Sequence, residues 1–326
     1  MKFLIIRLSS IGDIVLTTPV IRCLKKQVPD AEVHFLVKNS FRPVVEHNPY
    51  IDKLHVLAHS WELMIEELRS ENYDYIIDLH HNTKTLRVKN ALKKRSFSFY
   101  KLNIQKYFYT AFKINVLPKI HIVDPYMKTV ESFGVKNDGA GLDYFIGNNE
   151  IKKEDIPASH SAGYIACVIG AAHGTKRWPV HKWKEFCEKM DHPVILLGDQ
   201  HDAAHANEIV SVDPVRVYNA CGKFTLNESA DLVRRSKLVI SNDTGLMHIA
   251  AAFKRPVISL WGNTVPSFGM TPYYGDAPVS DVIMQVKKLW CRPCSKIGYN
   301  KCPLGHFKCM EKIDADDVIS KVKARI

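Results

Sequence analysis

The 326-residue sequence has no apolar run long enough to cross a membrane. The longest, residues 163–172, has ten residues, whereas a membrane-spanning helix needs about 18. The N-terminus, MKFLIIRL, lacks the uninterrupted apolar stretch and cleavage site of a signal peptide, because Arg7 and Asp13 break it. Eight cysteines in a chain of this length do not make a disulfide scaffold. These absences exclude a membrane-spanning protein and predict a cytoplasmic one.

Acidic residues are missing altogether from residues 79–123, where ten basic residues occur. A second basic stretch, residues 287–312, holds seven lysines and arginines against Glu311 alone. The whole chain carries a formal charge of +11, so these two stretches account for more than the entire excess. Positive charge concentrated in this way favours an anionic partner, which could be nucleic acid, a membrane surface or a phosphorylated substrate.

Two common phosphate-binding motifs are also missing. The turn Ser9-Ser10-Ile11-Gly12-Asp13 contains one glycine, not the three of G-x-G-x-x-G, which disfavours an NAD-type dinucleotide site. Residues 170–179, GAAHGTKRWP, combine small residues with Lys176 but lack the P-loop spacing. Any nucleotide site must therefore be of another kind.

Buried strand-length runs alternate with amphipathic helix-length segments along the chain. Strands are predicted at residues 2–8, 32–37, 53–57, 75–79, 163–169, 193–197, 238–241 and 256–261. Helices are predicted at residues 14–28, 61–69, 180–190, 225–235 and 246–253. Thr225 and Glu228 have the spacing of a capping box at the start of one of these helices.

This alternation predicts βαβ units and parallel sheets, so the fold class is α/β. We expect two doubly wound parallel-sheet domains, residues 1–155 and 156–326, with a cleft between them. The polar residues 147–162 are the predicted linker, and the last helix could pack back on the first domain.

The turn Asn242-Asp243-Thr244-Gly245 follows a predicted strand and opens a predicted helix. Ligands of open α/β sheets bind at the carboxyl ends of strands, and a helix N-terminus favours a phosphate group. A simple helix cap by Asp243 or Thr244 explains the turn equally well. Asp13 also has two possible roles, since it could be a general base or a helix cap.

Four stretches in this order resemble glycosyltransferase family 9, the bacterial ADP-heptose:lipopolysaccharide heptosyltransferases. They are RLSSIGDIVLTTPVIRCLKKQVPDA at residues 7–31, YDYIIDLHHNTKT at 73–85, GTKRWP at 174–179 and SNDTGLMHIAAAFKRPVISLWGNTVP at 241–266. The resemblance implies a GT-B fold of two Rossmann-like domains, with the acceptor domain first and the nucleotide-sugar domain second. It implies an inverting transfer that needs neither a metal nor another cofactor.

The resemblance also implies roles for individual residues. Asp13 matches the catalytic base, and the donor-binding positions are Lys176, Asp202, Asp243, Thr244, Gly245 and His248. Inverting transfer needs a base on the acceptor hydroxyl and positive groups on the departing diphosphate, which this set supplies. The family usually reads G-P-T-x-P where this sequence has Gly262-Asn-Thr-Val-Pro266, so the donor contacts differ there.

The implied partners are ADP-heptose and a lipopolysaccharide core precursor, bound peripherally at the anionic inner face of the inner membrane. The candidate acceptor contacts come from the acid-free stretch: Lys84, Arg87, Lys93, Lys94 and Arg95. The aromatic residues between these cations either pack in the core or settle at the level of the lipid headgroups. No nucleic-acid partner is expected.

Four cysteines, Cys291, Cys294, Cys302 and Cys309, crowd into nineteen residues and begin with a C-x-x-C. A zinc site, disulfides and free thiols all fit this spacing. The alternatives to an ADP-heptose transferase are a family member that uses another nucleotide sugar, a GT-B-fold epimerase and a nucleic-acid-binding α/β protein. The last lacks a helix-turn-helix, zinc-finger or RNP signature.

Overall fold

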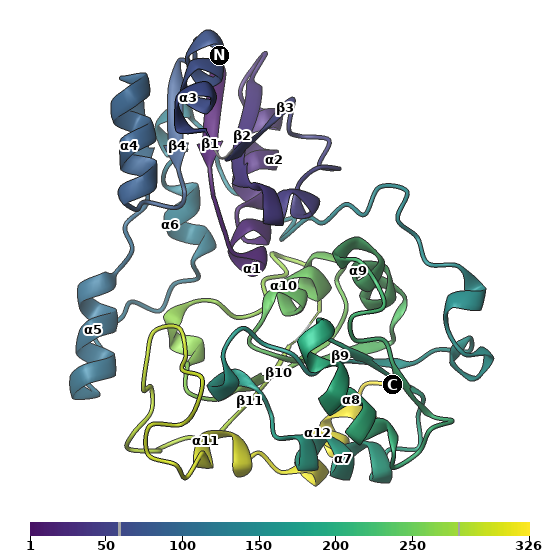
Figure 1. The fold of residues 1–326 in the computed structure, drawn as a ribbon. Coiled ribbons are helices and arrows are strands. Elements are labelled where there is room, and N and C mark those ends of the chain that lie inside the picture. The colour runs from purple at the N-terminus through teal and green to yellow at the C-terminus, as the bar shows by residue number, and fades with distance from the viewer. Residues whose placement is uncertain (58–59, 280) are drawn as a thin grey trace. The chain divides into compact units, whose positions relative to one another are not determined.

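The computed structural model describes residues 1–57, 60–279 and 281–326. The chain forms two units, each built on one parallel sheet (Figure 1). The first unit comprises Met1–Lys101, Ile120–Phe145 and Tyr273–Ala277, and the second Leu102–Lys119, Ile146–Pro272 and Pro278–Ile326.

The sheet of the first unit has the strand order β3-β2-β1-β4-β5. Its elements are β1 (Lys2–Ile6), α1 (Ile11–Val15), α2 (Thr18–Gln27), β2 (Glu32–Lys38), β3 (Lys53–Leu57), α3 (Trp61–Ser70), β4 (Tyr75–Asp78), α4 (Thr83–Leu92), β5 (Arg95–Ser98) and α6 (Val123–Met127). Along β1, Leu4 and Ile6 face the core shared with α3 and α4. Phe3 and Ile5 alternate with them and are just as buried, as a strand covered on both faces requires.

The sheet of the second unit has the strand order β11-β10-β9-β6-β7-β8. The elements of this unit are α5 (Asn103–Phe112), β6 (Ile165–Val168), α7 (Val180–Lys189), β7 (Val194–Leu197), α8 (Ala203–Val210), β8 (Val217–Asn219), α9 (Leu226–Arg235), β9 (Leu238–Asn242), α10 (Gly245–Ala252), β10 (Val257–Trp261), β11 (Val282–Gln285), α11 (Lys308–Glu311) and α12 (Ala315–Lys323). α7, α8 and α12 share one core with the sheet, whereas α9 and α10 contact each other. Both sheets are therefore doubly wound, and the predicted α/β fold class is confirmed.

Two local predictions have different outcomes. The capping box is confirmed, since Thr225 N donates to Glu228 Oε2 (2.7 Å) and Glu228 N donates to Thr225 Oγ1 (3.3 Å). The prediction of a single helix at residues 14–28 is wrong, because two separate helices, α1 and α2, occupy this segment. Pro19 lies in the first turn of α2 and has no N–H to donate to the preceding turn, so a new helix starts there.

The polar residues 147–162 belong to the second unit. Ile151 is buried and its N–H donates to Asp231 Oδ2 (3.0 Å), while Glu150 pairs with Arg234 (2.7 Å). The last helix, α12, packs on α7 and β10 of its own unit. Within the described ranges, no helix is long and apolar enough to cross a membrane.

Candidate active site

Asp13 lies just beyond the carboxyl end of β1, in the first turn of α1. Its Oδ2 accepts hydrogen bonds from Ser10 Oγ (2.7 Å) and Ser10 N (3.4 Å), and its Oδ1 lies 2.7 Å from Arg7 Nη2. The side chain keeps 24% of its surface exposed. The carboxylate therefore closes the first turn of α1 and also presents an accessible oxygen face, so the two functions do not exclude each other.

Arg7 holds Asp13 in place. It is buried, and its Nε donates to Ser9 O (2.8 Å), while its Nη1 donates to Leu79 O (2.5 Å) and Tyr126 Oη (2.8 Å). A guanidinium tied at this many positions has a fixed orientation, and its remaining nitrogen points to Asp13. Arg7 neutralises the Asp13 charge and sets the direction of its carboxylate.

The turn after β4 adds a histidine to this neighbourhood. Buried Asp78 organises the turn, because its Oδ1 accepts from His80 N (3.1 Å) and His81 N (2.7 Å), while Lys89 pairs with its Oδ2 (2.9 Å). Burial, with a smaller contribution from Arg7 and Lys101, lowers the pKa of His80 to about 4. His80 is therefore neutral at neutral pH, and within the described part of the chain its buried Nδ1 has no hydrogen-bond partner.

Burial, followed by the charge of Arg7, also lowers the pKa of Lys101. Sequence reasoning missed Arg7, His80 and Lys101 as neighbours of Asp13. A signal existed for His80, which lies in the motif YDYIIDLHHNTKT, but only the fold brings the ends of β1 and β4 together.

The five candidate acceptor cations are all exposed, but they do not form one group. Lys84 lies in the first turn of α4, near the carboxyl end of β4, where Asp78 lies. Arg87 stacks over the ring of Trp61, with its guanidinium carbon 4.5 Å from the ring centre.

Lys93, Lys94 and Arg95 lie at the other edge of the sheet. Arg95 begins β5 and pairs with Tyr75, the first residue of β4, whereas Asp78 is the last. The strands are parallel, so these three cations are at the amino-end edge and Asp13 is at the carboxyl-end edge. The fold therefore does not bring all five cations within reach of one acceptor sugar at Asp13.

In the second unit, Lys176 and Asp243 lie together at the carboxyl end of β9. Lys176 Nζ is 2.7 Å from Asp243 Oδ2, which also accepts a hydrogen bond from Thr264 Oγ1 (2.8 Å). Thr244 precedes the first turn of α10 and Gly245 begins it. The first amides of a helix have no partner within the helix and carry positive partial charge. An ammonium group and a helix N-terminus thus share one small region.

Buried side chains fix the loops around this region. Asn242 Nδ2 donates to Ile169 O (2.8 Å), and Asn242 Oδ1 accepts from Trp178 N (3.0 Å). Thr175 Oγ1 donates to Asn263 Oδ1 (3.1 Å), and a Cβ on Gly262 would lie 2.4 Å from Thr175 O. Asn263, which stands where the family pattern has proline, therefore has a structural use, because it holds the loop that carries Lys176.

The remaining two donor candidates are buried. His248 lies in α10 and is 2% exposed. Asp202 is also 2% exposed and packs below Gly170 and Gly198, where added Cβ atoms would lie 2.1 Å and 2.7 Å from its Oδ2. Burial raises the pKa of Asp202. It lines a cavity of about 200 Å³ with Arg177 and Trp183, and its Oδ1 lies 3.1 Å from Arg177 Nη1.

The four clustered cysteines are free thiols, so the disulfide alternative is not the state of this structure. Cys294 Sγ donates to Cys291 O (3.0 Å), and Cys291 Sγ lies 3.7 Å from His306 Nε2. Burial raises the pKa of Cys294 to about 11 and that of Cys309 to about 12. Among the described residues, one group of His, Cys, Asp or Glu has ligand atoms within 4.8 Å of one another, and it contains no cysteine.

Comparisons with known proteins identify the family. The model of glycosyltransferase family 9 (heptosyltransferase) matches residues 61–304. Lipopolysaccharide heptosyltransferase 1 of Campylobacter coli is 26% identical over 99% of this chain and 98% of its own. Lipooligosaccharide heptosyltransferase 2 of Haemophilus influenzae is 29% identical over 86% of this chain and 87% of its own.

A solved structure shows the same fold. The E. coli heptosyltransferase WaaC with ADP superposes with a TM-score of 0.73, at 20% identity, over the whole of both chains. The fold of two parallel-sheet units, the family match over most of the chain and the similarity to these relatives lead to one conclusion. The chain is an enzyme and belongs to glycosyltransferase family 9, the heptosyltransferases.

Proposed function

We propose that this enzyme transfers a heptose, with inversion, from ADP-heptose to an inner-core acceptor of lipopolysaccharide. The relatives are named for lipopolysaccharide and lipooligosaccharide heptosyl transfer, and a related structure contains ADP. The observation that carries the proposal is the Lys176–Asp243 pair at the start of α10. A cation beside a helix N-terminus at a strand's carboxyl end suits a diphosphate.

The donor diphosphate would bind Lys176 and the free amides of α10. Asp243, which itself accepts a hydrogen bond from Thr264, holds the Lys176 ammonium in position before the donor arrives, so little reorganisation is needed. Charge grows on the departing ADP as the glycosidic bond breaks, and fixed positive groups stabilise that charge. Lys176 and the helix N-terminus provide them, so we propose a transfer that needs no divalent cation.

The acceptor hydroxyl would give its proton to Asp13 as its oxygen attacks the anomeric carbon. One bond forms between that oxygen and the carbon. The bond from the carbon to the diphosphate breaks, and its electron pair leaves with ADP. Ser10 and Arg7 aim the Asp13 carboxylate, which is what a general base requires. Lys84, Arg87, Lys93, Lys94 and Arg95 would attract an anionic acceptor at longer range.

The acceptor's lipid anchor implies work at a membrane surface, and α5 has the side chains for it. Ile104, Tyr107, Phe108 and Phe112 lie on one face of α5 and are between 43% and 64% exposed. Three of their rings form a cluster with centres 5.6 to 6.4 Å apart. Exposed aromatic residues on a helix without acidic residues are typical of helices that lie at the headgroup level.

The two basic stretches meet next to this helix. Lys113, at the end of α5, lines a hollow of about 370 Å³ with Lys287, Lys288 and Arg292 of the second stretch. Lys113 Nζ also donates to Pro293 O (2.8 Å). Each cation near an anionic surface contributes about 1 kcal/mol. We propose that α5 and this hollow attach the enzyme to an anionic bilayer.

Changing Tyr107, Phe108 and Phe112 together to Ser should weaken binding to phosphatidylglycerol-containing vesicles by about 10-fold or more, measured by sedimentation. The side chains are exposed, so stability should change little. Leu63→Ser, at an equally exposed apolar residue of α3, is the matched control. Unchanged vesicle binding in the triple variant would contradict the proposal that α5 binds the membrane surface.

Ligand-induced stabilisation tests the donor. ADP at 100 times its Kd should stabilise the enzyme by about 2.7 kcal/mol and raise Tm by a few degrees. UDP, GDP, NAD and duplex DNA should not. Stabilisation by UDP or GDP in place of ADP would favour another nucleotide sugar, and stabilisation by DNA alone would contradict the donor site. A transfer assay with defined acceptors then identifies the sugar and the acceptor.

A further inference from the structure

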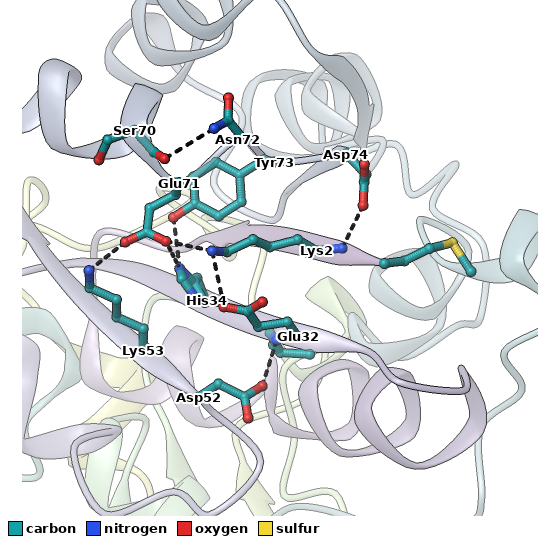
Figure 2. A network of polar contacts seen from close by, with 12 residues as sticks. Lys2, Glu32, His34, Asp52, Lys53, Ser70, Glu71, Asn72, Tyr73 and Asp74 are labelled. Carbon is teal, nitrogen blue, oxygen red and sulfur yellow. Dashed lines mark hydrogen bonds and ion pairs between the residues drawn. The ribbon is translucent and has the colours of Figure 1, made fainter.

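A second cluster of polar side chains lies in the first unit, away from Asp13. His34 of β2, His55 of β3 and Tyr73, two residues before β4, are each 1% exposed. Glu71 lies beside them, between Lys2 and Lys53, as Figure 2 shows. Neither the family's transfer reaction nor the proposed donor and acceptor sites use these residues.

Three atoms of this cluster converge on one point. His34 Nδ1 lies 3.1 Å from His55 Nε2, and Tyr73 Oη lies 2.9 Å from each of these nitrogens. The hydroxyl of Tyr73 points at the His34 ring in Figure 2. Glu71 Oε2 comes within 3.9 Å of His34 Nδ1. The ligand atoms of His34, His55 and Glu71 all lie within 4.8 Å of one another.

The outer ring nitrogens determine what the inner ones can do. His34 Nε2 contacts Glu32 Oε1 (2.9 Å) and His55 Nδ1 contacts Glu67 Oε1 (2.7 Å). An ionised carboxylate only accepts, so each outer nitrogen carries the proton, and in a neutral ring the inner nitrogen is left with a lone pair.

The lone pairs of His34 Nδ1 and His55 Nε2 therefore meet the Tyr73 hydroxyl, and the hydroxyl proton is the one proton among these three atoms. Tyr73 can donate to one imidazole, so the other inner nitrogen faces a lone pair at close range. Buried polar groups normally have partners, and a contact of this kind is unfavourable unless a cation completes it. The two glutamates on the outer nitrogens are the arrangement that orients metal-binding histidines.

We propose that His34, His55 and Glu71, with Tyr73, form a zinc-binding site. Tetrahedral zinc with ligands about 2.0 Å away has ligand atoms about 3.3 Å apart. His34 Nδ1 and His55 Nε2, 3.1 Å apart, are close to this spacing, and Glu71 Oε2, 3.9 Å from His34 Nδ1, would have to move toward them. Imidazole and carboxylate ligands suit Zn²⁺.

The charges around the cluster allow a cation. Lys2 pairs with Glu32 and Glu71, Lys53 pairs with Glu71, and Glu67 contacts His55. Two lysines and three glutamates give a formal sum of −1. The lysines compete with zinc for Glu71, so the histidines carry most of the affinity. Bound zinc would tie β2, β3 and the start of β4 together near their amino ends. Its role is structural, because Asp13 is at the opposite sheet edge.

Zinc titration of the full-length, EDTA-treated protein tests the proposal. We expect one Zn²⁺ per chain at this site by calorimetry, with the imidazole ¹⁵N signals of His34 and His55 shifting on binding. Glu67→Gln should weaken zinc affinity about 10- to 100-fold, because an amide can donate to His55 Nδ1 and reverse its tautomer. Glu67 is exposed, so this variant should fold, and the neighbouring exposed Glu66→Gln is the control.

The cysteines are the competing zinc ligands in this chain. Co²⁺ held by nitrogen and oxygen lacks the intense charge-transfer bands of a cobalt–thiolate site, so its spectrum separates the two. Thiolate bands without any change in the histidine signals would overturn the proposal. Histidine signals that titrate with pH but do not respond to zinc would also overturn it, and would identify a shared proton as the occupant.

Discussion

Replacing Asp13 by Asn should lower kcat by about 100-fold or more while ADP binding stays the same. The amide keeps the size of the carboxylate, and its single oxygen can still accept from either Ser10 or Arg7, which bind different oxygens of Asp13. It cannot take a proton from the acceptor hydroxyl. The measurement is steady-state transfer with saturating donor and acceptor, together with ADP calorimetry.

Folding has to be followed in the same variant. Buried Arg7 loses a charged partner, and removing one member of a buried pair is often costly. Arg7 keeps its bonds to Ser9 O, Leu79 O and Tyr126, so the variant should still fold. Asp314→Asn, which also removes a helix N-terminal carboxylate, is the control and should keep full activity. Turnover near the wild-type rate in a folded Asp13→Asn variant would reduce Asp13 to a helix cap.

The elements that sequence could predict are those whose signal is local. Continuous apolar runs predict β1, β6 and β9 because strands covered on both faces have no polar side. The Thr225–Glu228 capping box needs only four residues of sequence. The proximity of Lys176 and Asp243 could also be predicted from the sequence, because both residues follow strand ends of one parallel sheet.

Contacts between distant residues could not be predicted. Arg7 is 72 residues from Leu79 and 119 from Tyr126, and no local pattern says that it will join them. His34 and His55 meet because β2 and β3 are neighbours in a specific register. The burial of Asp202 against Gly170 and Gly198, which follow two different strands, also needed the fold. The aromatic residues of the acid-free stretch had two possible locations, and only the fold shows that Phe99 is buried whereas Tyr107, Phe108 and Phe112 are exposed on α5.

Replacing Lys176 by Ala should lower kcat/KM for the donor by about 10²- to 10³-fold and weaken ADP binding at the same time. The Lys176 ammonium would face the diphosphate when the donor is bound. In the transition state it would face the larger negative charge on the same oxygens. Binding and rate should therefore fall together. Lys182→Ala is a matched control, because both lysine side chains are 17% exposed and each pairs with one carboxylate.

Two comparisons locate the effect at the phosphates. The affinity for adenosine should stay the same in Lys176→Ala, whereas that for ADP falls; an equal loss for both ligands would mean a distorted loop. Removing Lys176 also leaves Asp243 facing the diphosphate without its cation. The double variant Lys176→Ala, Asp243→Asn should therefore bind ADP more tightly than Lys176→Ala alone, which a double-mutant cycle measures. If calorimetry finds wild-type ADP affinity in Lys176→Ala, the donor diphosphate does not bind at the start of α10.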